Sequence, residues 1–218
     1  MLDLDFRCRG ARPATWAATP TMLLDLEVQE PSGRRLYGIR LQCQIRVEPI
    51  RRRYSSAEEE ALGELFGEPA RWGDTLKPIQ VCTVSTMVPG FTGNSSFELP
   101  VPCTYDTEVA AAQYFRALAG GDIPLLLLFS GTVYYAGDDG LLVEQVPWDR
   151  EIAYRLPVAT WRALMDAHFP GTGWLRLQTD TIEALQRYRR ARMLPSWEDT
   201  FAALLKEAGV TEVGARPT

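Results

Sequence analysis

Histidine and lysine are scarce in this sequence. Its 218 residues include one histidine, His168, and only two of the 23 basic residues are lysines, Lys77 and Lys206. Any Ser-His or Cys-His mechanism must therefore use His168. The formal net charge of −5 lacks the basic excess that nucleic-acid-binding proteins normally have. We expect no nucleic-acid partner, and the preference for arginine does not by itself indicate phosphate binding.

The sequence contains no apolar run long enough to span a membrane. A spanning helix needs about 18–20 apolar residues, but the most apolar stretch, GGDIPLLLLFSGTVYY at 120–135, is interrupted by Ser130 and Gly131. The first twenty residues also lack the basic start and apolar core of a signal peptide. We therefore expect a cytoplasmic protein without membrane insertion.

Sequence motifs of common catalytic and cofactor sites are also missing. The chain has no G-x-S-x-G nucleophile motif, no phosphate-binding loop and no dinucleotide fingerprint. Its cysteines form no C-x-x-C pair, so we expect four reduced, mostly buried thiols. They are Cys8, Cys43, Cys82 and Cys103. We expect neither a cofactor nor a metal, although a zinc site made of dispersed ligands stays open as an alternative.

Apolar and polar residues alternate in two neighbouring segments near the N-terminus. Leu24, Leu26 and Val28 alternate with polar residues within 22–29, and a longer alternation follows within 36–48. A period of two is typical of strands with one buried face, and the intervening Pro-Ser-Gly indicates a turn. These segments predict an antiparallel hairpin.

The apolar stretch at 123–135 predicts a central strand. A Gly-Asp turn and an apolar segment at 141–148 follow it, so the two segments predict a second hairpin. The four leucines at 125–128 do not alternate with polar residues, which predicts that the core covers one face and a helix the other. Gly131 within the strand indicates a bulge or a close approach of two backbones.

Helical segments interrupt the strands and dominate the C-terminal end. Ser56 and Glu59 have capping-box spacing at the start of a helix that Gly67 and Pro69 end. Further helices are predicted near residues 106–119, 158–169, 179–193 and 196–209. Strands first and helices last predict an α+β fold, with a largely antiparallel β-sheet packed against helices and a helical C-terminal part.

The change in character near residue 157 suggests how the chain is organised. We expect residues 1–156 to form an antiparallel sheet domain with two inserted helices. Residues 157–218 are expected to form a C-terminal helical part that packs on the same core, within one structural domain. No internal repeat or low-complexity segment is visible.

Arginines cluster at residues 51–53 and again at 187–192. Both clusters are predicted to be solvated surfaces, and the first lies close to the acidic residues 58–60. The alternative for residues 51–53 is contact with an anion or an acidic partner. The alternative for residues 187–192 is an RNA-binding helix, which the negative net charge disfavours.

Aromatic residues at turns are the strongest sign of a binding surface in this sequence. Partly exposed aromatic side chains anchor many protein interfaces, whereas the alternative role for these residues is to cover the ends of the core. The candidate partner-binding residues are Trp72, Phe91, Tyr105, Tyr135, Trp148 and Trp174.

Several longer segments resemble one protein family. They are VPGFTG at 88–93, LPVPCTYD at 99–106, FSGTVYY at 129–135, VPWDRE at 146–151 and LPVATWRALMDAHFPGTGWLRL at 156–177. Together they resemble a family of uncharacterised actinobacterial proteins, a domain of unknown function, whose members are often encoded beside nickel–iron hydrogenase genes. The resemblance extends from Leu24 to the last helix. It implies an accessory or assembly role and transfers no catalytic residue.

A second resemblance is centred on residues 102–135. The order of helix, glycine pair and proline-started strand there, together with the predicted hairpin at 23–48, is similar to the SecB export chaperone. The chain departs from SecB by adding a hairpin and three helices. The SecB tetramer and its client grooves therefore do not carry over.

These observations favour a non-enzymatic, cytoplasmic accessory or assembly protein. It would be chaperone-like, in the manner of SecB, and would bind another protein such as a hydrogenase subunit or precursor; a homo-oligomer is compatible with the sequence. Two alternatives stay open. One is a hydrolase or transferase that uses His168 with a cysteine or carboxylate partner, and the other is a small-ligand-binding module with its pocket under the leucines at 125–128.

Overall fold

The computed structural model describes residues 2–103, 109–137, 140–171, 175 and 177–210. The chain divides into two compact units, Met1–Thr172 and Gly173–Thr218. Among the described residues, all strands belong to the first unit and the second contains helices only. The fold is α+β with antiparallel sheets, as the sequence predicts.

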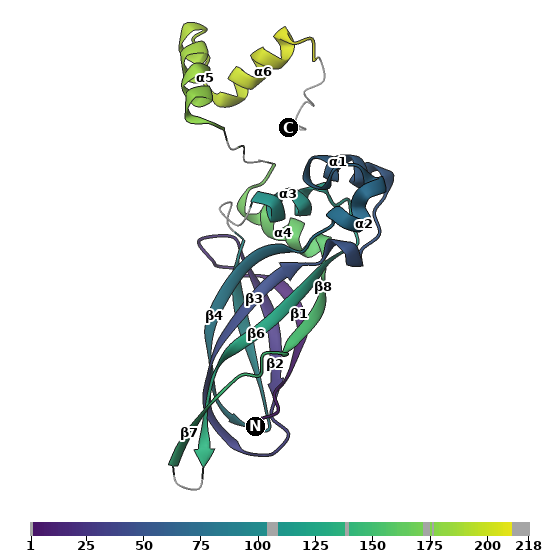
Figure 1. Ribbon diagram of the computed structural model, residues 1–218. Helices are drawn as coiled ribbons and strands as arrows, with labels where there is room; N and C mark the ends of the chain where they lie inside the picture. Colours follow the sequence, from purple (N-terminus) through teal and green to yellow (C-terminus); the bar gives the residue numbers. More distant parts are fainter. Residues whose placement is uncertain (1, 104–108, 138–139, 172–174, 176, 211–218) are drawn as a thin grey trace. The chain divides into compact units, whose positions relative to one another are not determined.

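The strands of the first unit form two antiparallel sheets (Figure 1). The first has the order β1-β2-β5, and the second has the order β4-β3-β6-β7, with β8 also paired to β6. The strands are β1 Asp5–Pro13, β2 Thr21–Gln29, β3 Arg35–Val47, β4 Ile79–Thr92, β5 Asn94–Pro102, β6 Asp122–Gly137, β7 Gly140–Gln145 and β8 Glu151–Pro157. Pro100 and Pro102 lie in β5, an edge strand, where a missing N–H donor costs the sheet nothing.

The two sheets face each other across one apolar core. Phe6 of β1 and Phe129 of β6 stack between them, with ring centroids 4.3 Å apart. The edge strands β4 and β5 contact each other, and so do β1 and β8. Alternate side chains of β2 and β3, such as Leu24, Leu26 and Leu41, are buried in this core. The alternation in the sequence therefore reflects a two-sheet sandwich.

The predicted hairpin between residues 22–29 and 36–48 is wrong in its pairing. Both segments are strands, but β2 pairs with β1 and β5, whereas β3 pairs with β4 and β6. The chain crosses between the sheets at the intervening turn. There the buried carboxylate of Glu30 accepts hydrogen bonds from the backbone N–H groups of Ser32 and Arg34. Alternation identifies a strand, but it does not identify the neighbouring strand.

Helices gather at one end of the strands in the first unit (Figure 1). With two short 3-10 turns, they are η1 Pro49–Arg51, α1 Ser56–Phe66, η2 Pro69–Arg71, α2 Trp72–Thr75, α3 Val109–Ala117 and α4 Val158–His168. Trp72 packs edge-on against Tyr54 and Phe66, and Phe66 packs likewise against the fully buried Tyr114. This aromatic cluster joins the helices to one another. No helix among the described residues is long and apolar enough to cross a membrane.

Strand β6 is central in the second sheet, as predicted. It pairs with β3 on one side, and with β8 and then β7 on the other. Leu125 and Leu127 enter the core, while Leu126 points to the outer face and is nevertheless buried. The expected helix over that outer face is not found in the described part of the first unit (Figure 1). Arg46 of β3 and Ala153 of β8 flank Leu126 instead.

The helix predicted near residue 56 is confirmed, but its cap lies one residue earlier. The Ser55 side chain accepts a hydrogen bond from the backbone N–H of Glu58, and the Glu58 carboxylate accepts one from the backbone N–H of Ser55. Ser56 and Glu59 have the same spacing, so the sequence pattern fits either register. The observed register turns Glu58 toward the body of the unit.

Glu58 forms a buried ion pair with Arg52, whose Nη2 lies 2.5 Å from Glu58 Oε1. The same guanidinium donates to the carbonyl oxygens of Gly120 and Asp122, and Glu58 accepts a hydrogen bond from the N–H of Ala119. Burial alone would raise the pKa of Glu58, but backbone hydrogen bonds and the charge of Arg52 hold that pKa below its ordinary value. The pair fixes the α3–β6 connection to the start of α1.

The described helices of the second unit are α5 Thr179–Ala191 and α6 Trp197–Glu207. Ser196 and Asp199 form the capping box of α6 that their spacing predicts. Helix α4 lies within the first unit, Met1–Thr172, and contacts β1, β2 and β8. The packing of α5 and α6 on the same core stays a prediction.

Replacing Glu58 with glutamine is expected to lower the free energy of unfolding by about 3 kcal/mol near neutral pH, because Arg52 loses its buried counter-charge. The folded-state pKa of Glu58 is lowered. Its contribution is therefore present above the ordinary carboxyl pKa of about 4.3 and is lost as the pH falls through the folded value. The free energy of unfolding of the wild-type protein should fall on acidification. The variant should show a smaller fall, because the contribution of Glu58 is absent from it at every pH. Denaturant unfolding at a series of acidic pH values measures both.

Glu60→Gln is the matched control, because Glu60 is an exposed residue of the same helix. We expect this variant to change the free energy of unfolding by less than about 0.5 kcal/mol. Equal losses in the two variants would contradict the stabilising role of the buried pair.

Gly131→Ala should destabilise the second sheet. Gly131 has a φ of 143°, and a Cβ at this position would overlap the carbonyl oxygen of Arg40 on β3. This is the close backbone approach that the sequence predicts, and we expect a loss of about 2–3 kcal/mol in denaturant unfolding. Gly63→Ala, at an open position within α1, should instead stabilise the protein by about 0.8 kcal/mol. A similar effect at both positions would show that the close approach does not matter.

Candidate protein-binding surface

Strand β7 is an edge strand with an exposed, apolar sequence. Among the described strands it pairs with β6 alone, and Leu141, Leu142 and Val143 are 60%, 46% and 57% exposed. Edge strands are commonly protected from further pairing by a lysine, a proline or a bulge. The sequence of β7, GLLVEQ, contains none of these. The free edge of β7 is therefore open to another strand.

The one charged residue of β7 is engaged by the protein's own groups. Glu144 accepts a hydrogen bond from the backbone N–H of Leu2 at 3.0 Å and another from the hydroxyl of Tyr135 at 3.3 Å. These bonds hold its carboxylate against Leu2 and Tyr135. The exposed part of the strand is apolar.

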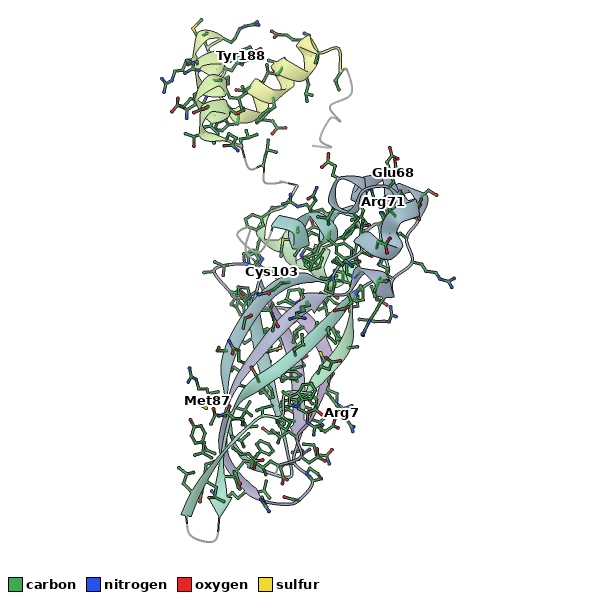
Figure 2. All side chains as sticks on the ribbon, viewed as in Figure 1. Arg7, Glu68, Arg71, Met87, Cys103 and Tyr188 are labelled. Atoms are coloured by element: carbon green, nitrogen blue, oxygen red, sulfur yellow. The ribbon has the colours of Figure 1, made fainter. Side chains whose placement is uncertain are left out.

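Two further apolar side chains lie on the outer face of the same sheet. Tyr37 of β3 and Met87 of β4 are each more than half exposed, and Figure 2 marks Met87 at the margin of the sheet. Between them and β7, Tyr134 of β6 lies in register with Gly38 on one side and Val143 on the other. The exposed residues Tyr37, Met87, Leu141 and Val143 are together named the β7 patch.

A small cavity adjoins Tyr37. It has a volume of about 240 Å³, and the ends of β3 and β4 line it, including Leu36, Tyr37, Gly90 and Phe91. A Cβ at Gly90 would lie 2.8 Å from the backbone oxygens of Leu36 and Tyr37, so glycine permits the close approach of these strands. The cavity is several times larger than the roughly 30 Å³ of a water molecule. Its volume is large enough for one side chain.

The charged side chains that border the β7 patch, on β3 and directly before it, are arginines. Arg34 lies over the Tyr135 ring, 5.7 Å from its centroid. Arg35 lines the small cavity, and Arg40 is in register with Met87. All three arginines are exposed. A partner segment that places acidic residues next to apolar ones would complement this surface.

The structure separates the six predicted partner-binding residues. Trp72 and Tyr135 are buried rather than exposed. The polar atoms of both are satisfied internally, because the Trp72 indole donates to the carbonyl oxygen of Gly67 at 2.9 Å and the Tyr135 hydroxyl to Glu144. Large aromatic rings beside turns fill the ends of the core here.

The other four candidates have different positions. Phe91 is half-buried in the wall of the cavity beside the β7 patch. Trp148 is 94% exposed in the turn between β7 and β8. Tyr105 and Trp174 lie outside the described residues. Phe91 is thus the predicted residue that adjoins the observed apolar surface.

The sequence does not predict that Leu141, Leu142 and Val143 are exposed, because their apolar run resembles that of the buried strand before it. The exposure of Met87, in contrast, could be predicted from the sequence. It has the same phase along β4 as Thr83 and Ser85, which are exposed in the structure. An apolar residue at a polar phase of an alternating strand marks an outward-facing hydrophobic side chain.

His168 has no partner suited to nucleophilic catalysis in the described part of the chain. Its Nδ1 lies 3.0 Å from the carbonyl oxygen of Leu164, and its Nε2 lies 3.3 Å from that of Ala17. No cysteine, serine or carboxylate among the described residues is hydrogen-bonded to the ring. The histidine joins the end of α4 to the connection between β1 and β2.

The four cysteines are free, and burial raises the pKa of each thiol. The pKa is raised to about 11 for Cys8 and Cys82, and to about 12 for Cys43 and Cys103. Such thiols are protonated near neutral pH and are weak nucleophiles. Figure 2 places Cys103 at the helical end of the strands. No three metal-ligating side chains lie together among the described residues.

Comparison with known proteins identifies a family. The family described as "Family of unknown function (DUF6084)" matches residues 1–213. No curated protein matches the chain.

Among solved structures, two similar ones have low TM-scores. A Bordetella pertussis protein described as ApaA has a TM-score of 0.26 at 11% identity, over 72% of this chain and 95% of that one. A β-glucosidase from Kluyveromyces marxianus has a TM-score of 0.27 at 8% identity, over 71% of this chain and 15% of that one. These TM-scores are too low to carry an argument about fold or function.

Alkylation of the cysteines should be slow in the folded protein. Because the raised pKa values of about 11 to 12 keep the thiols protonated, the rate near neutral pH should be roughly a hundredfold below that of the unfolded chain. The rate should rise as the pH approaches 11. Iodoacetamide labelling followed by mass spectrometry measures each cysteine separately. Rapid labelling of one folded-state cysteine near neutral pH would restore the alternative that pairs a cysteine with His168.

Proposed function

We propose that this chain, which belongs to the family DUF6084, is a non-enzymatic accessory or assembly protein that binds an extended segment of a partner protein along β7. The observation that carries the proposal is the free, unprotected and apolar edge of β7. A segment that adds to a sheet edge gains main-chain hydrogen bonds for affinity, while its alternate side chains supply specificity.

The surroundings of β7 define the chemistry of the bound segment. One face of an added strand would continue the outer face of the sheet, where Tyr37, Met87 and Val143 are exposed. Apolar side chains are expected on that face. The exposed Arg35 nearby favours an acidic residue in the segment. The partner segment therefore combines apolar and acidic residues.

A hydrogenase subunit or precursor is the partner to test first, because the sequence resembles proteins encoded beside hydrogenase genes. Capture of an extended segment would make the protein chaperone-like, in a cytoplasmic setting. This choice of partner rests on the sequence resemblance, whereas the choice of surface rests on β7. The two parts of the proposal are tested by different arms of one experiment.

The tagged chain is co-expressed with the hydrogenase subunits and purified under native conditions. Wild-type protein should recover a hydrogenase subunit or precursor. Leu141→Lys/Val143→Lys should recover about tenfold less while remaining folded, because two charges on an exposed edge block strand addition without disturbing the core. Trp16→Lys/Met193→Lys adds the same two charges at side chains that are 95% and 89% exposed elsewhere, and it should behave as wild type.

Three results would count against the proposal. Partner-free wild-type protein would contradict the hydrogenase assignment. Equal recovery by the β7 variant would contradict the use of the edge. A wild-type dimer in light scattering that becomes monomeric in the β7 variant would show that a second copy of the chain occupies the edge.

A further inference from the structure

A second, larger cavity lies at the helical end of the first unit, and its lining is basic. It has a volume of about 730 Å³, and its charged lining residues are Arg51, Arg52, Arg53, Glu58, Asp122 and Arg155. It opens where η1, the start of α1 and the α3–β6 connection meet. Strand β6 begins at this cavity and ends beside β7. The cavity and the β7 patch therefore occupy opposite ends of one strand.

Arg52 and Glu58 neutralise each other and hold the wall of the cavity. Besides its ion pair with Glu58, the Arg52 guanidinium donates to the carbonyl oxygen of Gly120 at 2.7 Å and to that of Asp122 at 2.6 Å. These bonds fix the guanidinium. The pair makes the wall of the cavity rigid, whereas other residues give the cavity its net charge.

Arg51, Arg53 and Arg155 supply that charge. All three are exposed, and none of their side chains makes an ion pair or hydrogen bond with another described residue. Asp122 is the remaining carboxylate in the lining. Four arginines and two carboxylates give the lining a net charge of +2, in a chain whose net charge is −5. Unpaired arginines around one cavity repel each other, and a bound anion would remove that repulsion.

Gly120 and Gly121 also line the cavity and have no side chain to fill it. Gly121 has a φ of +69°, and a Cβ there would lie 3.3 Å from Arg52 Nη1. Its carbonyl oxygen accepts a hydrogen bond from the N–H of Val158 at 2.9 Å. The connection is thus anchored to the start of α4 and holds its open shape.

We propose that this cavity binds a phosphate dianion, either free phosphate or the phosphate group of a small phosphorylated molecule, through Arg51, Arg53 and Arg155. Guanidinium groups pair with phosphate oxygens in a two-pronged geometry, and the net charge of the lining matches that of a dianion. The volume lies within the roughly 300–1,000 Å³ of small-molecule sites, so there is room for an organic group as well. The start of α1 is already capped by Ser55 and Glu58. The bound phosphate would therefore be held by the arginines and not by the N-terminus of this helix.

Calorimetric titration of the full chain tests the proposal, with inorganic phosphate, glycerol 3-phosphate and acetate at constant ionic strength. We expect saturable binding of a phosphate compound and no binding of the monoanion acetate. Tighter binding of glycerol 3-phosphate would identify a phosphorylated small molecule as the ligand. Tighter binding of inorganic phosphate would identify free phosphate.

Arginine variants locate the binding. Arg51→Gln/Arg155→Gln should weaken binding about a hundredfold, or about tenfold for each lost charge-assisted interaction. Arg187→Gln/Arg190→Gln changes the charge equally at exposed positions of α5 and should leave the affinity unchanged. If the first variant does not fold, as judged by circular dichroism, Arg53→Gln replaces it with an expected tenfold loss.

Two results would overturn the proposal. One is the absence of saturable binding of either phosphate compound to the wild-type protein. The other is an equal loss of affinity in the two double variants, which would show unspecific attraction to arginine. The inference is independent of partner binding, because Leu141→Lys/Val143→Lys should bind phosphate as wild type does.

Discussion

The pairing of β6 with its neighbours is the interaction on which the rest of the structure depends. β6 is hydrogen-bonded to β3 on one side and to β8 and β7 on the other. Phe129 of β6 meets Phe6 of the opposite sheet, and Gly131 allows β3 to approach closely. Asp122, the first residue of the strand, lies in the basic cavity, while the last residues carry β7. One rigid strand therefore positions both candidate surfaces.

Features that depend on neighbouring residues could be predicted from the sequence, and features that depend on distant ones could not. The alternation in β2 and β3 and the capping box of α6 are local patterns. The pairing of strands is not local, so two consecutive alternating strands enter different sheets around the buried Glu30. The uninterrupted leucines of β6 predict that both faces of the strand are buried. Neighbouring strands, and not a helix, flank Leu126 on the outer side.

The same distinction applies to the candidate surface. Tyr135 is two residues from Val133 along β6, points to the same face and is buried like it. Its position in the alternation therefore predicts its burial better than its aromatic character does. Met87 is marked by its polar phase along β4. The exposure of Leu141 depends on the position of β7 at the edge of the sheet. Only the topology shows that an apolar strand lies where a partner can pair with it.

The central claim is that the free edge of β7 accepts a strand from a partner. Amide hydrogen exchange in the purified complex tests this claim most directly, because main-chain pairing protects the amide groups that it engages. Between Leu141 and Val143, the account predicts fast exchange in the free protein for the amides that face away from β6, and slower exchange of the same amides in the complex. Amides of β1, in the opposite sheet, should change little. Unchanged exchange in β7, with new protection elsewhere on the molecule, would contradict the account.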